Sequence, residues 1–144
     1  MGLLADFFVA PPDEALQYED SLSNRAASVE RFKPAEYRNL TGLEIGILWA
    51  MLIGEEWSVD KHMLTEVRSS DGGETWLLSF PPGLVDVLAG MTDKELDSAA
   101  VEWASIEELS LWEPEHTKGL LDDLRRLSND AKSSGKELFL WGSL

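Results

Sequence analysis

The two ends of this chain carry its most strand-like patterns of apolar residues. Residues 3–9 form a short apolar and aromatic run that stops at Pro11 and Pro12, which predicts a buried strand. Near the other end, residues 136–141 predict a second strand, directly after Gly135. We expect these two strands to pair with each other in one sheet.

The most apolar stretch, residues 41–54, predicts a core helix. Thr41 and Glu44 have the spacing of a capping box, in which each side chain bonds a backbone amide near the helix start. The helix should run to about Ile53, with Gly54 in the left-handed conformation that commonly ends helices. It is too short for a hydrocarbon core, which needs about 20 residues, so we expect it inside a folded domain.

Two longer helices are predicted in the second half of the chain. Thr92 and Glu95 form a second capping-box match, and Pro114 suits the first turn of the last helix. The expected buried stripe of the first is Leu96, Ala99, Ala100, Trp103 and Ile106. That of the second is Leu120, Leu121, Leu124, Leu127 and Ala131.

Weaker patterns fill the remaining segments. Residues 12–18 and 83–91 predict short helices, residues 20–28 a loop, and residues 29–37 an edge strand or irregular segment because of Pro34. Ser58 can cap a helix through Val59, Met63 and Val67, which are four residues apart. Residues 75–80 fit either a helical turn or a short strand.

These elements predict an α+β fold. The chain has 144 residues, 44% of them hydrophobic, which suits one globular domain over residues 1–144 with a sizeable core. No linker is long enough to separate two domains. We expect a mostly helical domain with a small sheet that includes the N- and C-terminal strands.

Charge changes the range of expected partners. The chain has 27 acids and 12 bases, a formal charge of −15, which repels phosphate backbones and anionic lipids. We therefore expect neither nucleic acid nor membrane as a partner. The acids are densest at residues 92–116, where eight face the single base Lys94. This segment is either a solvated face or a surface that attracts a basic partner.

The absence of cysteine excludes disulfides, thiolate nucleophiles and thiolate metal sites, and it favours the cytoplasm. The N-terminal run has no basic leading segment and contains Asp6, so it does not read as a secretory signal. We expect a cytoplasmic protein.

Chemistry-bearing residues gather where the predicted core helix ends, in "EEWSVDKH". His62 with Glu55, Glu56 and Asp60 could serve acid–base or metal chemistry, and Glu113 and Glu115 lie near the other histidine, His116. Neither group has the HExxH spacing, and the chain has no GxSxG elbow or phosphate-binding glycine loop. We expect no metal site and no cofactor.

Tryptophan is frequent, with six in the chain. Trp57, Trp112 and Trp141 lie beside acids or chain ends, where tryptophan is either the margin of a core or a binding anchor. Trp57 is the preferred anchor because Glu55, Glu56 and Asp60 surround it. The candidate binding surface is Glu55, Glu56, Trp57, Asp60, His62 and Trp112.

The layout of the chain resembles the YfbM-like family of small uncharacterised bacterial proteins. The resemblance rests on the opening "MGLLADFFVAPPDEAL", the central helix "LEIGILWAMLIG" and the closing "LRRLSNDAKSSGKELFLW". It implies an α+β fold and a bacterial origin. It supplies no activity and no catalytic residues.

Three hypotheses on function follow. The first is a non-enzymatic interaction protein, of immunity or regulatory type, whose acidic surface binds a basic partner protein. The alternative is a small hydrolase or metal-dependent enzyme using His62 with Glu55, Glu56 and Asp60. In the third, the charge serves solubility and the function lies in a small apolar pocket. The sequence leaves the oligomeric state open.

Overall fold

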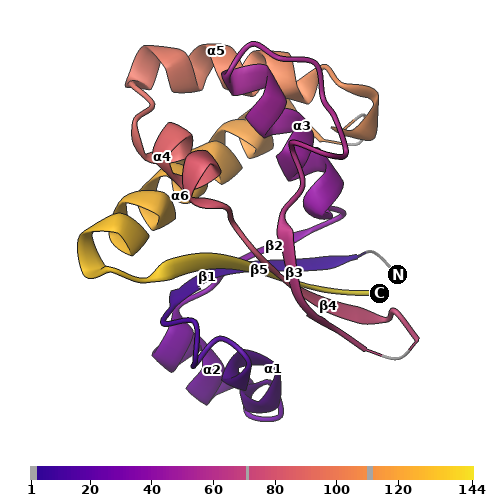
Figure 1. Cartoon of the computed structure of the whole chain (residues 1–144), viewed down its shortest axis with the longest axis vertical. Helices are drawn as coiled ribbons and strands as arrows, with labels where there is room; N and C mark the ends of the chain where they lie inside the picture. The colour runs from indigo at the N-terminus through magenta and orange to yellow at the C-terminus, as the bar shows by residue number, and fades with distance from the viewer. Residues whose placement is uncertain (1–2, 71, 110–111) are drawn as a thin grey trace.

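The computed structural model describes residues 3–70, 72–109 and 112–144. Within these ranges, the strands form one antiparallel sheet in the order β2-β1-β5-β4-β3 (Figure 1). The strands are β1 (Leu4–Ala10), β2 (Ala35–Arg38), β3 (Thr65–Ser69), β4 (Thr75–Ser79) and β5 (Glu137–Ser143). The N- and C-terminal strands pair along their whole length, from Leu4 opposite Ser143 to Ala10 opposite Glu137. The predicted α+β fold with paired terminal strands is confirmed.

Helices cover both faces of the sheet (Figure 1). One face carries α3 (Gly42–Leu52), α4 (Pro82–Ala89), α5 (Asp93–Ala104) and α6 (Pro114–Ser134), and the other carries α1 (Gln17–Ser21) and α2 (Arg25–Phe32). Strand β1 serves both layers because its side chains alternate: Ala5 and Phe7 enter the larger core, whereas Phe8 and Ala10 enter the smaller one. A sheet covered on both faces explains why residues 3–9 are apolar at successive positions, with Asp6 as the exception.

The larger core contains the stripe predicted for α6, whose five residues are all buried. The stripe predicted for α5 is buried except at Ile106, which follows the helix and is half-buried. Trp103 is fully buried, and its indole N–H donates to the backbone oxygen of Glu44 over 3.1 Å. This bond fixes α5 against α3.

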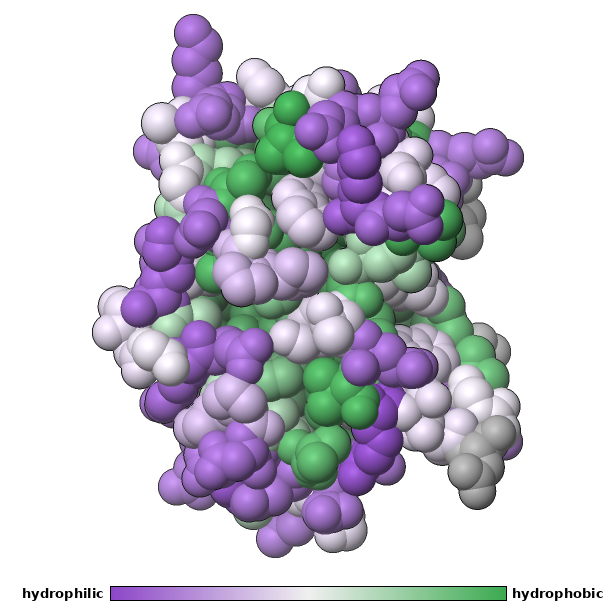
Figure 2. Space-filling view, in the orientation of Figure 1, coloured by the Kyte–Doolittle hydropathy of each residue, from purple (hydrophilic) through white to green (hydrophobic). Residues whose placement is uncertain are grey.

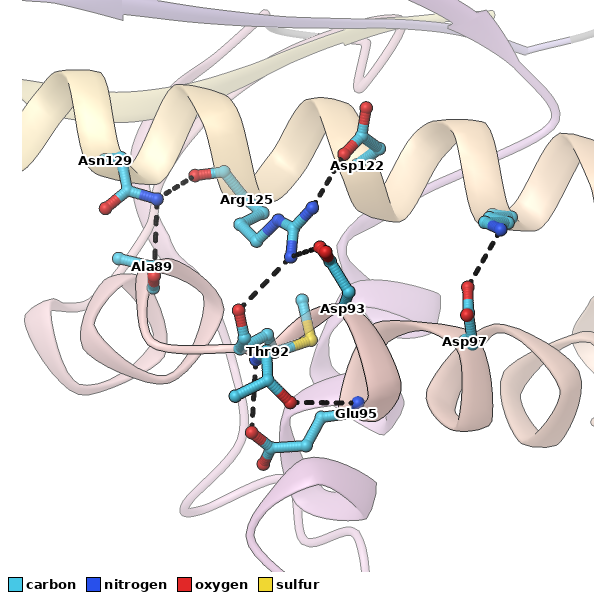
Figure 3. Close-up of polar contacts among 10 residues, drawn as sticks. Ala89, Thr92, Asp93, Glu95, Asp97, Asp122, Arg125 and Asn129 are labelled. Carbon is cyan, nitrogen blue, oxygen red and sulfur yellow. Dashed lines mark hydrogen bonds and ion pairs between the residues drawn. The ribbon is translucent and has the colours of Figure 1, made fainter.

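The start of α5 is a capping box, as predicted. The Glu95 amide donates to the Thr92 hydroxyl, and the Thr92 amide donates to the Glu95 carboxylate, both over 3.1 Å (Figure 3). Arg125 of α6 reaches the same helix end, where it pairs with Asp93 over 2.9 Å and donates to the Met91 carbonyl. The contacts tie the start of α5 to the middle of α6.

The start of α3 differs from the predicted capping box. The Thr41 hydroxyl accepts from the Leu43 amide and donates to the Glu44 carboxylate over 2.7 Å. Glu44 is buried, and the Thr41 hydroxyl takes the place of the cap amide as the donor to its carboxylate. Thr41 still caps the helix, and Gly54 has the expected positive φ of 70°.

The weaker predictions have mixed outcomes. The loop predicted at residues 20–28 is wrong, because Asn24 caps α2 by accepting from the Ala27 amide. After Pro34 the edge strand β2 forms. Residues 75–80 contain strand β4, and the short helix predicted at residues 83–91 is α4, which begins one residue earlier, at Pro82. Within residues 12–18, turns precede the short α1.

The helix predicted from Val59 to Val67 is also wrong. Residues 58–62 form a turn, and β3 follows. Val59, Met63 and Val67 are all exposed, so their four-residue spacing does not reflect a buried helical stripe. From Thr65 onward, a hairpin with β4 supplies the backbone hydrogen bonds instead.

Hydrophilic side chains cover most of both helical layers on the face shown in Figure 2, and apolar side chains reach the surface in small areas between them. Such scattered apolar exposure is normal for a protein surface. Among the described residues, no helix combines the length and the apolar content needed to cross a bilayer.

Candidate functional site

The segment that follows α3 folds back onto that helix. The Glu55 amide donates to the Ala50 carbonyl, and the amides of Lys61 and His62 both donate to the Ser58 carbonyl, which closes a turn. Gly46 on α3 makes room for this turn, since a Cβ there would collide with the His62 backbone oxygen. The sequence "EEWSVDKH" is therefore packed against α3 through a glycine.

His62 is the buried centre of this segment, with 1% of its surface exposed. Its Nδ1 accepts from the Ser58 amide over 2.9 Å, which places the ring proton on Nε2, 3.0 Å from a Glu55 carboxylate oxygen. The Trp49 ring meets the imidazole edge-on at 5.7 Å. We call Trp49, Glu55, Ser58 and His62 the His62 cluster. Its hydrogen bonds close the turn, and the contact with the Trp49 ring packs the imidazole against α3.

The predicted group of His62 with three carboxylates converges only in part. Glu55 meets His62, whereas the side chains of Glu56 and Asp60 are exposed and make no hydrogen bond or ion pair among the described residues. Both ring nitrogens of His62 are engaged within the chain, so neither faces a substrate. Within the described part of the chain, no three His, Asp or Glu residues are placed to hold a metal ion.

Trp57 lines a groove of about 400 Å³ next to the His62 cluster. The groove lies between the end of α3, residues 54–57 and the end of α5, with Met51 and Ile106 on its apolar walls. Glu55 and Glu102 also line it, and the described lining holds no lysine or arginine. Trp57 is 40% exposed. The groove thus combines an accessible indole with two carboxylates.

The acidic segment 92–116 is partly neutralised in the fold. Asp93 pairs with Arg125 and Asp97 with Lys118, both over 2.9 Å (Figure 3). Glu102, Glu107 and Glu108 are exposed and have no ion pair among the described residues. Uncompensated negative charge therefore collects toward the end of α5, where the groove lies.

Trp112 lies apart from the other candidate residues. It lines a separate pocket of about 410 Å³ with Tyr37 and His116, and its indole stacks on the Tyr37 ring at 6.0 Å. Tyr37 in turn donates to the Asp123 carboxylate. The candidate binding surface is therefore divided. Glu55, Glu56 and Trp57 lie beside the groove, whereas Trp112 lies near β2.

A second polar cluster was missed from the sequence. Asp6 on β1 is 3% exposed and accepts from the Tyr18 hydroxyl over 2.7 Å and from Arg25 over 3.2 Å. Arg25 also pairs with Glu36 on β2. We call these four residues the Asp6 cluster. Burial, together with the bond to Asp6, raises the pKa of Tyr18 well above its usual value.

The Asp6 cluster borders a cleft of about 520 Å³, which Arg38 and Trp141 also line. One feature of the sequence indicates the Asp6 cluster. Asp6 stands inside a run predicted to be buried, and a buried carboxylate requires donors. The donors Tyr18 and Arg25 could not be identified, because their spacing from Asp6 follows no periodicity.

No protein family and no curated protein matches the sequence. A search of solved structures finds similarity to the crystal structure of YfbM from Escherichia coli, a protein of unknown function. The match covers 98% of this chain and 99% of that chain, with 10% identity and a TM-score of 0.48. The match is to a YfbM protein, as the resemblance stated from the sequence expected, and it assigns no activity to this chain.

Proposed function

We propose that this chain is a non-catalytic binding protein, of immunity or regulatory type, that holds a basic segment of a partner protein in the groove beside Trp57. The observation that carries the proposal is that Trp57, Glu55 and Glu102 line the same groove. The indole offers a rigid apolar surface for the stem of a lysine or arginine, and the carboxylates bind its charged end.

The long-range electrostatic field of the chain also favours a basic partner protein. A formal charge of −15 accelerates the approach of a cationic protein and slows that of an anionic one. The uncompensated acids Glu102, Glu107 and Glu108 direct that attraction toward the groove. Tryptophan is frequent among the few interface residues that supply most of the binding energy.

The cleft beside the Asp6 cluster is a weaker candidate for binding a basic partner. Its two acids, Asp6 and Glu36, share the cleft with the two bases Arg25 and Arg38, so its lining carries no net formal charge. A catalytic role for His62 gains no support from its buried ring and its two occupied nitrogens. The groove therefore remains the best site for a partner.

The test is retention of proteins from native lysate on immobilised protein, at low and at high salt. We expect a basic protein to bind the wild type at low salt and Trp57→Ala at least about tenfold more weakly. The double variant Glu55→Gln with Glu102→Gln should bind more weakly as well, while the new amide at position 55 still accepts from His62.

The matched control is Asp13→Asn with Glu30→Gln, which removes two exposed carboxylates from the opposite layer. It should retain the partner almost as well as the wild type. Equal retention by the wild type and Trp57→Ala, or no bound protein at low salt, contradicts the proposal.

We also propose the bacterial cytoplasm as the compartment of this binding protein. The absence of cysteine supports it, since thiol-free chains need no oxidising environment. Fractionation of the source cells, with detection of the native protein, tests this assignment. Recovery in a secreted fraction would overturn it.

A further inference from the structure

The outer edge of β2 is open. Strand β2 ends the sheet, and its only neighbour among the described strands is β1. The Asn39 amide donates to the Leu3 carbonyl over 2.8 Å, which fixes the alternation of hydrogen bonds along the pair. Tyr37 therefore bonds toward β1, and the backbone groups of Glu36 and Arg38 point to the open edge.

Glu36 and Arg38 also share one face of the sheet, because alternate side chains of a strand point the same way. Glu36 pairs with Arg25 of α2, so this is the face covered by α1 and α2. Both side chains are exposed. The edge thus presents an acid and a base on the same side, two residues apart, at two positions whose backbone groups have no partner among the described strands.

We propose that the β2 edge pairs with the β2 edge of a second copy of this chain. In an antiparallel pairing centred on Tyr37, Glu36 of each copy lies opposite Arg38 of the other. Both are positions with outward backbone groups, so each pair exchanges its N–H···O hydrogen bonds. Opposite charges directly across a strand pair are stabilising. The two sheets then join into one, with two-fold symmetry and equivalent layers on the same side.

The other edge strand, β3, has the same order of residues, Glu66, Val67 and Arg68, but it cannot pair in this way. A bulge lies between Glu66 and Arg68: Glu66 is opposite Leu78, whereas Arg68 is opposite the next residue, Leu77. Leu78 and Leu77 face opposite layers, and so do the acid and the base. Such a bulge is a common protection against edge pairing.

Local charge also favours the β2 edge. Residues 25–38 contain four bases and two acids, a formal charge of +2 within a chain of −15. Two copies that meet there place their least acidic segments together and keep the acidic ends of α5 available. The strand is short, so we expect weak association, with a dissociation constant above about 1 µM.

The first test measures the dissociation constant by sedimentation up to about 1 mM protein. Glu36→Arg and Arg38→Glu each place like charges across the interface and should raise the constant at least about tenfold. The double variant restores opposite charges and should return to within about threefold of the wild type. The control Arg68→Glu, on the bulged edge, should leave it unchanged.

Three results contradict the proposal: a wild type that stays monomeric at about 1 mM, single variants that associate like the wild type, or a double variant that stays dissociated. Circular dichroism of each variant verifies folding.

A second test does not depend on charge. Tyr37 would face Tyr37 of the second copy, with Cα atoms about 4.5 Å apart, a separation that a disulfide can bridge. Because the chain has no cysteine, Tyr37→Cys introduces a single thiol. Mild oxidation should cross-link Tyr37→Cys at least about tenfold faster than the control Val67→Cys on β3. Equal rates would overturn the pairing.

Discussion

The Asp6 cluster and the His62 cluster each attach a local segment to the core through a buried polar side chain. The two clusters differ in which member carries the charge and where that charge lies. The Asp6 cluster buries the carboxylate and leaves Arg25 partly exposed, whereas the His62 cluster buries an imidazole and leaves the Glu55 carboxylate about half exposed. Burial of a charge requires donors on the protein side, while an exposed charge is solvated by water.

The difference indicates which member of each cluster contributes most to the free energy of unfolding. In the Asp6 cluster the buried carboxylate depends on its partners, because only 5% of its side chain is exposed. In the His62 cluster the ring depends on packing and on the Ser58 amide, and its carboxylate partner is dispensable. Substitutions at corresponding members should therefore have unequal effects on stability.

The largest effect should come from Asp6→Ala. It leaves the buried Tyr18 hydroxyl without an acceptor and removes one partner of Arg25. We predict a loss of about 3 kcal/mol in the free energy of unfolding, measured with urea. Asp6→Asn keeps an acceptor and should lose less. A loss below about 1 kcal/mol for Asp6→Ala would show that the cluster does not depend on the carboxylate.

His62→Ala should have the next largest effect. The substitution empties a ring-sized space beside Trp49 and leaves the Ser58 amide without its acceptor. We predict a loss of about 2 kcal/mol, measured in the same way. An equal loss in Asp60→Ala, an exposed neighbour in the same turn, would mean that the turn and not the imidazole determines the effect.

Tyr18→Phe tests the Asp6 cluster by pH. The raised pKa of Tyr18 means that the folded protein keeps the phenolic proton after the unfolded chain has lost it. The folded state then binds more protons, so stability is full below about pH 10 and falls as the pH rises above it. Tyr18→Phe should cost about 1.5 kcal/mol at neutral pH and make the alkaline fall shallower.

The alkaline fall should not vanish in Tyr18→Phe, because burial and the bond to Asp123 also raise the pKa of Tyr37, the other tyrosine of the chain. The ultraviolet absorbance of tyrosinate should appear together with unfolding. Its appearance near pH 10 in the folded protein would contradict both assignments.

Glu55→Gln should have the smallest effect. Glutamine can still accept from His62, and the lost charge is half exposed. We predict a change below about 0.5 kcal/mol in the free energy of unfolding. A loss as large as that of His62→Ala would mean that the exposed carboxylate, and not the packing of the ring, supports the cluster.

The fold could be predicted where local chemistry and burial agree. The terminal strands, α5 and α6 have caps, breakers and apolar stripes that the core then uses. Helix α2 was missed because only Ser28 and Phe32 are buried in it, so it has almost no apolar stripe. Strand β3 was missed because it is exposed on both faces, and an exposed strand shows no alternation.

The candidate site could be predicted only in part, because adjacency in the chain indicates proximity but not direction. The sequence placed Glu55, Trp57 and His62 in one segment, and the turn at Ser58 determines that Glu55 points at the ring while Asp60 points away. Glu102 also lines the groove, but it lies on α5, far from Glu55 and Trp57 along the chain, so adjacency in the sequence did not indicate it. The Asp6 cluster joins four elements through tertiary packing, which no local pattern encodes.

The pairing of the first and last strands has a consequence for synthesis of the protein. Strand β5 lies between β1 and β4, so without it the sheet separates into the β2-β1 pair and the β4-β3 hairpin. A growing chain can form these pieces and its helices early, but it cannot join them until β5 has left the ribosome. During translation the apolar edges of β1 and β4 stay unprotected, and a chaperone has its longest opportunity to bind there.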